Sequence, residues 1–281
     1  MATGDKNSAA TNSTKIALVT GAGSGIGRAI ALRLVADGLR VFGTSRKGDE
    51  GVSNGIEMLR LDVCSDASVE ACVGALLERT HGNDVLVNNA GYLQTGAVEE
   101  TTMEEAKAQF ETNFFGALRV IKAVLPSMRT RRRGAIINVT SLAGVVPLPF
   151  WGVYNASKFA LEGLTETLRH ELRPFGISVS AIEPGSIKTA FYAGDHTATP
   201  IADYVPWHRR FSKKMAEFEA SAPGPEIVAA AVSRAVQAAK PALRYRVTRE
   251  AFMFTSMRSW FPASIFESGL RSGFRLDDQR Y

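Results

Sequence analysis

The sequence predicts an α/β protein with a single doubly wound domain, about seven parallel strands and helices on both faces of the sheet. Short apolar runs of strand length alternate with segments of helical periodicity along most of the chain. A glycine-rich turn joins the first strand to the first helix. Residues 15–250 contain no Pro/Ser-rich linker and no internal repeat, so one domain accounts for them.

The strands are expected at residues 15–20, 40–46, 57–63, 84–91, 134–141, 177–185 and 244–250. The first of them, "KIALVT", is apolar without alternation, which is typical of a parallel strand covered on both faces. The helices between the strands make βαβ units with right-handed crossovers.

Helices are expected over 26–38, 68–80, 103–129, 153–173 and 225–239. In the first, Ile26, Ile30 and Leu34 share one face and Gly38 ends the helix. Ser65 or Asp66 caps the second, and the third is broken or bent near Asn113. The fourth ends before Pro174, and the last begins with a proline at its first position.

Composition excludes several classes of protein. The chain has 281 residues, of which 45 % are hydrophobic, and a net charge of +5, as expected for a soluble globular protein. Cys64 and Cys72 form no redox or metal motif, and the four histidines are scattered, so we expect no metal and a reducing, cytoplasmic setting. Residues 1–14 are polar and read as a flexible tail rather than a signal peptide, and no apolar run is long enough to span a membrane.

A basic cluster, "RTRRRG", occupies residues 129–134. It has two interpretations: a solvated helix end, where cations suit the helix dipole, or a patch that binds nucleic acid. Its place between a helix and a strand favours the first, and no nucleic-acid partner is expected.

The glycine-rich turn has the spacing G-x-x-x-G-x-G, with Gly21, Gly25 and Gly27 as its glycines and Ser24 and Ile26 between them. A strand precedes it and a helix follows, so the backbone N–H groups of the helix N-terminus are available to a phosphate. This predicts dinucleotide binding; the alternative is a tight turn without a ligand. The spacing differs from the commoner G-x-G-x-x-G.

The end of the second strand indicates which dinucleotide is bound. A carboxylate there would accept from the 2′-hydroxyl of NAD(H), but this strand ends "TSRK". Arg46 instead offers a planar cation to a 2′-phosphate, which favours NADP(H). An exposed arginine without this role is the alternative.

Tyr154 and Lys158 of "YNASK" stand one helical turn apart. A phenol normally titrates near pH ~10, and a fixed ammonium beside it lowers its pKa. The pair is a candidate proton donor, although Tyr-x-x-x-Lys also occurs on ordinary helix surfaces.

Several motifs follow one another in a fixed order: "TGAGSGIG" (20–27), "LDV" (61–63), "NNAG" (88–91), "NVTS" (138–141), "YNASK" (154–158) and "EPGSIKT" (183–189). Ser141 precedes Tyr154 by thirteen residues, and Asn113 lies in "ETNFFG". In these features residues 14–245 resemble the classical short-chain dehydrogenase/reductase family. "VPLPFWGVY" and "EPGSIKT" are similar to its branch of steroid, retinol and acyl-dihydroxyacetone-phosphate reductases.

The resemblance implies a Rossmann-type sheet with a nicotinamide cofactor across its carboxyl edge. It implies that Asp62 and Val63 hold the adenine, that the adenosine ribose lies along Asn89, Ala90 and Gly91, and that the nicotinamide lies along Pro184, Gly185, Ile187 and Thr189. Thr189 also suits a helix N-cap, and both roles stay open.

The resemblance further implies a catalytic set. Tyr154 is the general acid or base, and Lys158 lowers its pKa and binds the nicotinamide ribose. Ser141 orients the substrate carbonyl, and Asn113 holds a water that connects the lysine to solvent. The predicted function is therefore NADP(H)-dependent interconversion of a carbonyl and a secondary alcohol. The alternatives are a 3-oxoacyl-type reductase and a dinucleotide-binding regulator without catalysis.

Residues 190–222 read as an irregular substrate lid. Apolar side chains of this lid and of residues 144–154 suit a lipophilic substrate, with ordinary loop packing as the alternative; they are Phe191, Tyr192, Tyr204, Val205, Trp207, Val145, Leu148, Phe150 and Trp151.

Residues 251–281 form an apolar and basic extension. Met253, Met257 and Trp260 have helical spacing, and Pro262 interrupts the pattern. The extension caps the pocket, packs at a subunit interface or lies on a membrane surface. The resemblance implies a homodimer or homotetramer formed through residues 103–129 and 153–173.

Overall fold

An eight-stranded sheet forms the centre of the computed structural model, which describes residues 14–47, 51–193 and 196–276. The predicted flexible tail lies outside the described residues, except for residue 14. The strand order is β3-β4-β2-β1-β5-β6-β7-β8. Seven strands run parallel: β1 (Ile16–Val19), β2 (Arg40–Ser45), β4 (Ile56–Arg60), β5 (Val85–Asn88), β6 (Gly134–Val139), β7 (Ile177–Glu183) and β8 (Arg244–Arg246). The predicted parallel sheet is confirmed.

The eighth strand, β3 (Gly51–Ser53), was not predicted from the sequence. It pairs antiparallel with β4 at the sheet edge and is exposed along its whole length. Its turn is made by Asn54 and Gly55, which both have positive φ. Asn-Gly is the strongest short hairpin signal, but three exposed residues carry no apolar pattern that would reveal the strand.

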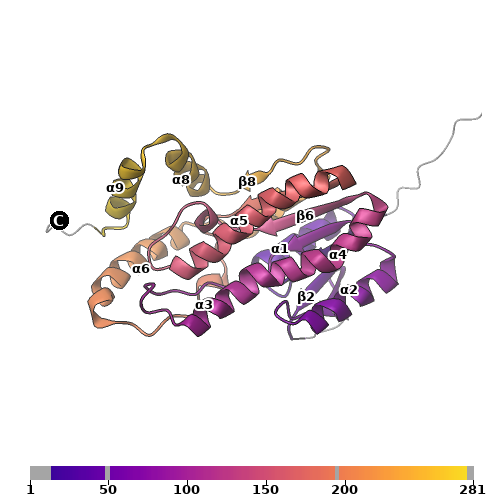
Figure 1. Ribbon diagram of the computed structural model, residues 1–281, viewed down its shortest axis with the longest axis horizontal. Coiled ribbons are helices and arrows are strands. Elements are labelled where there is room, and N and C mark those ends of the chain that lie inside the picture. The colour runs from indigo at the N-terminus through magenta and orange to yellow at the C-terminus, as the bar shows by residue number, and fades with distance from the viewer. Residues whose placement is uncertain (1–13, 48–50, 194–195, 277–281) are drawn as a thin grey trace, which may run out of the picture.

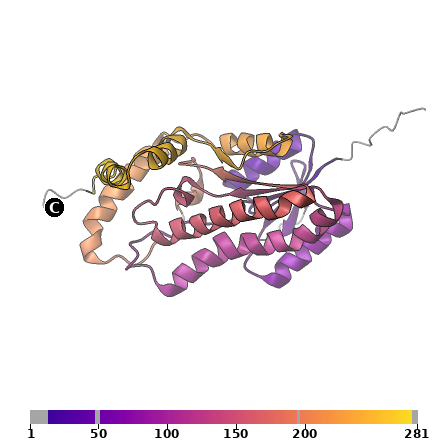
Figure 2. The same ribbon diagram turned by 45° about the horizontal axis from the view of Figure 1, so that its top comes forward.

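Helices cover both faces of the sheet (Figures 1 and 2). The first face carries α1 (Gly25–Ala36) and α7 (Glu226–Gln237), and the second carries α2 (Asp66–Thr80), α4 (Ala117–Arg131) and α5 (Gly152–Leu172). Alternate residues of each strand point to opposite faces. On β1, for example, Ala17 and Val19 pack with α1 and α7, whereas Leu18 packs with α2 and α4. This burial on both faces explains the continuous apolar strands.

The long helix predicted over 103–129 is present as two α-helical segments joined by a π-helical turn. α3 (Met103–Phe110) begins with a capping box, in which Thr102 and Glu105 bond each other's backbone N–H. A π-helical turn (Glu111–Gly116) then leads into α4. Asn113 lies in this turn, so the α-helix is interrupted where the sequence predicted a break or a bend.

The prediction of an irregular segment over 190–222 is wrong for most of its length. A helix, α6 (Val205–Ala220), follows two short 3₁₀ turns at Ala190–Ala193 and Ala202–Tyr204. Its apolar residues Phe211, Met215 and Phe218 have helical spacing and pack inward. The many charged residues between them hide this stripe in the sequence.

The predicted strand at 244–250 is also too long. β8 ends at Arg246 because Thr248 caps the next helix, its side chain accepting from the N–H of Ala251. That helix is α8 (Arg249–Trp260), and α9 (Ala263–Gly273) follows Pro262. The expected helix and its interruption at the proline are therefore present. Among the described residues, no helix is both long and apolar enough to cross a bilayer.

Two glycines provide a matched test of this packing. A Cβ at Gly43 would lie 2.8 Å from atoms of Ala22, Ile56 and Met58, whereas a Cβ at Gly74 in α2 would meet nothing within 4 Å. Gly43→Ala should lower the free energy of unfolding by about 1–3 kcal/mol, as overpacking does. Gly74→Ala should raise it by about 0.5–1 kcal/mol through helix propensity. Urea denaturation measures both, and a stable Gly43→Ala protein would contradict the packing.

Candidate active site

The carboxyl ends of β1 and β5 are joined by hydrogen bonds. Thr20 follows β1, and its Oγ1 accepts from the N–H groups of Asn89 (2.9 Å) and Ala90 (3.0 Å). In return, Asn89 Nδ2 donates to the carbonyl oxygens of Thr20 (3.0 Å) and Gly21 (3.3 Å). The glycine turn and the segment after β5 are therefore one rigid unit.

The glycine turn needs its glycines. Gly21 and Gly25 have φ values of +68° and +53°, which side-chain-bearing residues rarely adopt. A Cβ at Gly27 would lie 2.2 Å from the carbonyl oxygen of Gly21. Ser24 is the N-cap residue of α1, and Ile26 turns its side chain toward the core. What the turn presents at the sheet edge is therefore backbone N–H, the group that binds phosphate.

The predicted adenosine contacts follow the neighbouring strands. Arg46 is exposed at the end of β2. Asp62 follows β4, where its Oδ1 accepts from the N–H of Cys64 (3.0 Å) and its N–H donates to Ser68 (2.9 Å). Val63 is buried, and a Cβ on Gly116 would lie 2.7 Å from it. β2 and β4 pair directly, so Arg46 and Asp62 reach the same edge of the sheet.

Tyr154 and Lys158 lie together on a buried face of α5. Each is 5 % exposed, and Lys158 Nζ stands 5.9 Å from the centre of the phenol ring. Nζ donates to the carbonyl oxygen of Val139 at the end of β6 (2.9 Å). Burial lowers the pKa of Lys158 to about 8, although the Glu162 carboxylate acts to raise it. The lysine is thus a buried, oriented cation near neutral pH.

Asn113 uses its side chain to hold the chain after β5. Its Oδ1 accepts from the N–H of Tyr92 (3.0 Å), and its Nδ2 donates to Tyr92 O (3.0 Å) and Ser157 Oγ (3.2 Å). A Cβ on Gly91 would come within 2.9 Å of this Oδ1 and 3.8 Å of Lys158 Nζ. The amide is thereby occupied, so a water contact by this residue would use its backbone in the π-helical turn.

Ser141 begins the loop after β6. Its Oγ accepts from the N–H of Ala143 (3.0 Å), which caps a short 3₁₀ turn. A hydroxyl oxygen that accepts still has its hydrogen to donate. The next residue, Leu142, donates its N–H to Pro184 O (2.7 Å). The serine loop and the predicted nicotinamide loop are therefore tied together.

The predicted nicotinamide loop rests on the first turn of α8. Ser186 N donates to Glu250 Oε1 (3.1 Å). A Cβ on Gly185 would lie 2.3 Å from Thr248 Oγ1 and 2.8 Å from Glu250 Oε1, so only glycine fits there. Sequence reasoning missed Glu250 as a support because it placed a strand there. The available signal was the N-cap threonine followed by an acidic first turn.

At the other end of this loop, Ile187 is buried and Thr189 faces the glycine turn. A Cβ on Gly25 would meet Thr189 at 3.7 Å. Thr189 Oγ1 also accepts from the N–H of Phe191 (3.3 Å), at the start of the 3₁₀ turn Ala190–Ala193. Thr189 therefore makes an N-cap type of hydrogen bond, and its side chain still lies beside the glycine turn.

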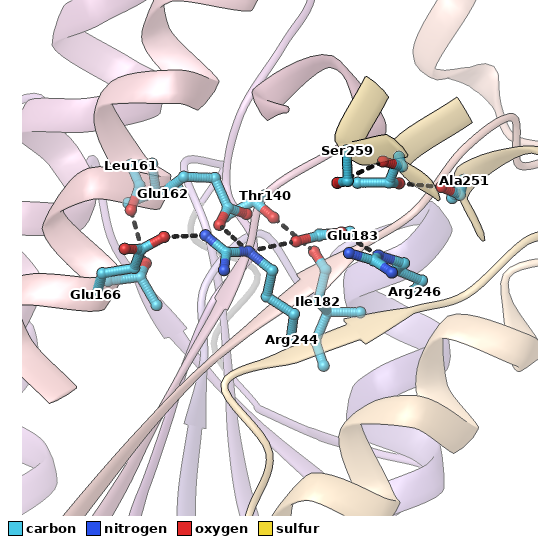
Figure 3. A network of polar contacts seen from close by, with 12 residues as sticks. Thr140, Leu161, Glu162, Glu166, Ile182, Glu183, Arg244, Arg246, Ala251 and Ser259 are labelled. Carbon is cyan, nitrogen blue, oxygen red and sulfur yellow. Dashed lines mark hydrogen bonds and ion pairs between the residues drawn. The ribbon is translucent and has the colours of Figure 1, made fainter. Parts of the chain in front are cut away.

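A buried cluster of carboxylates and arginines was not foreseen from the sequence (Figure 3). Arg244 Nε of β8 lies 2.8 Å from Glu183 Oε1 and 3.1 Å from Glu162 Oε2. Arg244 also contacts Glu166, and Arg246 lies 3.5 Å from Glu183 Oε2. The cluster joins β7, β8 and α5 directly behind Lys158 and the loop that starts at residue 184.

Apolar side chains surround Tyr154. Trp151 and Phe191 lie 5.9 and 6.1 Å from its ring, centre to centre. Val145, Leu148 and Phe150 belong to the same apolar cluster, as expected from residues 144–154.

Of the predicted lid residues, Tyr204, Val205 and Trp207 do not belong to this cluster. Tyr204 donates to Glu99 on the surface, Val205 is 37 % exposed, Arg210 covers Trp207, and the side chain of Tyr192 lies outside the description. Phe211, Met215 and Phe218 of α6 and Phe254, Phe266 and Phe274 of the extension belong to the cluster instead.

Within residues 14–47, 51–193 and 196–276, no three His, Cys, Asp or Glu side chains come together as a metal site would require. The open parallel sheet, the glycine turn and the buried tyrosine–lysine pair define a Rossmann-type oxidoreductase domain. The chain belongs to the short-chain dehydrogenase/reductase family, since residues 15–198 match the family model described as "short chain dehydrogenase".

Its relatives place it in the steroid- and retinol-like branch of that family. It is 38 % identical over 261 residues to a 3-ketodihydrosphingosine reductase of Bacteroides thetaiotaomicron. The match covers 92 % of this chain and 97 % of the relative. It is 36 % identical over 270 residues to 17-beta-hydroxysteroid dehydrogenase type 1 of Mus musculus, covering 88 % and 78 %.

Solved structures share the fold. The actinorhodin polyketide ketoreductase with NADPH has a TM-score of 0.69 and 32 % sequence identity, covering 83 % of this chain and 95 % of that one. Structural neighbours of this chain hold NAD or NADP.

We expect the buried cluster to make the stability of the protein depend on pH. Burial, and then the Glu162 carboxylate, raise the pKa of Glu183 from 4.5 to about 7, against the two arginines. Between these values the folded protein holds a proton that the unfolded chain has released, so the free energy of unfolding falls as the pH rises from about 4.5 to about 7. The glutamine in Glu183→Gln cannot titrate, so the free energy of unfolding of this variant should fall less steeply over this pH range.

Urea denaturation across that window measures the slope. Glu70→Gln, at an exposed carboxyl of α2, is the control and should keep the wild-type slope. Equal slopes in wild type and Glu183→Gln would show that the folded protein carries no raised pKa at Glu183.

Proposed function

We propose that this protein is an NADP(H)-dependent oxidoreductase that interconverts a carbonyl and a secondary alcohol on a lipophilic substrate. The observation that carries the proposal is the buried Tyr154–Lys158 pair inside an apolar cluster at the carboxyl edge of the sheet. A domain that only binds a dinucleotide has no need of a phenol held beside a buried ammonium.

The residues at the sheet edge fit a nicotinamide dinucleotide. The glycine turn presents N–H groups where a Cβ would block the backbone, which suits the pyrophosphate. Asp62 and Val63 would flank the adenine, and Asn89, Ala90 and Gly91 the adenosine ribose. Pro184, Gly185, Ile187 and Thr189 would flank the nicotinamide. When bound, the cofactor gives or takes the hydride.

Arg46 supports the choice of NADP(H). It is exposed at the end of β2, and the residue before it is a serine rather than a carboxylate. A guanidinium meets a phosphate with two parallel hydrogen bonds, while an absent carboxylate removes the repulsion of a 2′-phosphate. The proposed preference for NADP(H) over NAD(H) therefore rests on this position.

The proton is handled at Tyr154 Oη. In the reductive direction Tyr154 donates it to the substrate oxygen, and in the oxidative direction Tyr154 accepts it. The Lys158 ammonium favours the phenolate and so lowers the pKa of the phenol. Ser141 orients the substrate oxygen through its hydroxyl hydrogen. The backbone of Asn113 would hold a water that links Lys158 to solvent, since its amide is occupied by Tyr92.

The substrate class follows from the walls around the phenol. Trp151 and Phe191 lie against the phenol ring, and Phe211 packs on Trp151. Phe254 and Phe266 of the extension belong to the same apolar cluster. Such walls suit a long-chain ketone, a steroid or a retinoid. The names of the relatives, a reductase of a 3-keto sphingoid and a steroid dehydrogenase, support this choice.

A 3-oxoacyl-type reductase remains the second candidate. One relative is, by its name, a 3-ketodihydrosphingosine reductase, and a 3-oxoacyl chain also presents a 3-keto group. A panel of steroid, retinoid, long-chain 3-keto and 3-oxoacyl substrates, followed by nicotinamide absorbance with both cofactors, distinguishes the two.

Residues 190–222 would act as a lid built on α6. His208 Nε2 of this helix contacts the buried Glu100 carboxylate (2.7 Å), which also accepts from the N–H groups of Ala97 and Ile201. Phe211 packs on Trp151 at 5.8 Å. These contacts hold α6 over the apolar cluster, and their release would open it.

We also propose a homodimer or homotetramer in the cytoplasm, formed through residues 103–129, which span α3 to α4, and residues 153–173 of α5. Phe115, in the π-helical turn between α3 and α4, is 43 % exposed, which suits a subunit contact. Cys64 and Cys72 are free thiols, as expected in a reducing compartment.

Tyr154→Phe tests the chemistry. It removes the proton donor but keeps the ring packed on Trp151, so turnover should fall by at least ~100-fold, the low end of the contribution of a general acid. NADPH affinity, measured by the change in nicotinamide fluorescence, should stay within about twofold of wild type because the phenol oxygen contributes one contact among many. Retained turnover would exclude Tyr154 as the acid.

Arg46→Asp tests the cofactor. The carboxylate repels the 2′-phosphate and can accept from a 2′-hydroxyl, so kcat/KM for NADPH should fall at least ~10-fold while that for NADH stays equal or rises. Arg129→Gln, in the last turn of α4, is the control for loss of an exposed arginine and should change neither value. An unchanged NADPH/NADH ratio in Arg46→Asp would overturn the assignment of Arg46.

A further inference from the structure

The large exposed apolar side chains of the described residues concentrate in the last two helices. We define the α8–α9 apolar surface as Phe252, Met253, Trp260, Phe261 and Ile265. Trp260 is 85 % exposed, Phe252 62 % and Ile265 56 %. Exposed apolar residues scattered singly are normal, but five within fourteen consecutive residues form a patch that requires a partner.

The opposite side of the same helices is already used. Ala251 and Thr255 of α8 are buried, and Phe254, Phe266 and Leu270 pack into the apolar cluster around Tyr154. The two helices therefore have an inner apolar side, which roofs the proposed substrate site, and an outer one, the α8–α9 apolar surface. A helix that is apolar on two sides is normally covered on both.

The segment that carries the α8–α9 apolar surface is basic. Residues 246–276 contain five arginines, Arg246, Arg249, Arg258, Arg271 and Arg275, against two glutamates, Glu250 and Glu267. Glu250 accepts from Ser186 N, and Glu267 pairs with Arg271. Arg249 lines a groove of about 450 Å³ with Phe252, Met257 and Trp260. Cations thus stand directly beside the apolar side chains.

We propose that the α8–α9 apolar surface docks on an anionic phospholipid bilayer. Aromatic rings beside arginines match the headgroup boundary, where the rings enter the acyl region and the cations meet lipid phosphates. A second copy of this chain would bring its own arginines against these and suffer like-charge repulsion. α8 and α9 lie together along one edge of the fold in both ribbon views, so both helices can face the same bilayer (Figures 1 and 2).

Docking there would bring the proposed site to the membrane. α8 supports the nicotinamide loop through Glu250, and α9 contributes Phe266 to the cluster around Tyr154. A lipophilic substrate dissolves in the bilayer rather than in water. The inference deepens the proposed function by naming where the enzyme meets its substrate, but membrane binding itself requires no catalysis.

Sedimentation with vesicles tests the proposal on the full chain. Wild type should pellet with vesicles of phosphatidylglycerol and phosphatidylcholine and should pellet much less with phosphatidylcholine alone, with added salt weakening the difference. The double variant Trp260→Ser/Phe261→Ser should lose at least ~10-fold in vesicle affinity, because two rings no longer enter the apolar region. Val52→Ser/Val98→Ser, which removes two side chains 73 % and 71 % exposed elsewhere, should bind as wild type does.

Two further measurements keep the outcomes distinct. The tryptophan emission of wild type should shift to the blue on adding anionic vesicles, and Trp260→Phe should abolish most of the shift while retaining binding. The double serine variant should keep wild-type rates on a water-soluble ketone without vesicles, which shows that it is folded. Absence of catalysis in every variant would reject the proposed function and leave vesicle binding as a separate result.

Three results would overturn the docking proposal. They are failure of wild type to pellet with anionic vesicles, equal pelleting by the double serine variant, and a concentration-dependent self-association in ultracentrifugation that this variant loses while vesicles have no effect. The last would assign the α8–α9 apolar surface to a contact between copies of the chain.

Discussion

The hydrogen bond from Lys158 Nζ to the carbonyl oxygen of Val139 is the contact on which the proposed chemistry depends. It places a cation between α5 and the end of β6, where burial lowers the pKa of the lysine to about 8 and water cannot screen its charge. The backbone carbonyl gives the ammonium a fixed position. The phenol one turn earlier in α5 therefore experiences a constant field, which a flexible surface lysine could not provide.

The surroundings of Lys158 are built to hold this geometry from several sides. Asn113 positions the chain after β5 through both the oxygen and the nitrogen of its side-chain amide. Behind the lysine, Glu162 and Glu183 share Arg244, which binds the edge strand β8 to α5 and β7 (Figure 3). Breaking a buried ion pair leaves an uncompensated charge and is costly. The cluster therefore makes the position of α5 depend on β8, the last strand of the sheet.

The C-terminal extension is part of the same construction. Glu250 supports the loop expected to hold the nicotinamide, while Phe254, Phe266 and Phe274 belong to the apolar cluster that contains Tyr154. A truncation after β8 would therefore remove a support of the proposed cofactor loop and part of the apolar cluster of the proposed substrate site. This dual attachment explains how helices with an exposed outer surface remain fixed to the domain.

The sequence by itself determined the parallel sheet and the positions of its seven parallel strands along the chain, because these depend on local periodicity. It also determined the glycine turn, which uses conformations that favour glycine, and the tyrosine–lysine spacing. It also contained the stripe of Phe211, Met215 and Phe218, but the charges of α6 concealed it. Only the tertiary structure decided that Glu162, Glu183 and Arg244 meet, that Glu250 supports Ser186, and that the side chain of Asn113 is occupied. Those contacts join residues from about 20 to 80 positions apart, and no local pattern specifies which distant partner a buried polar group will find.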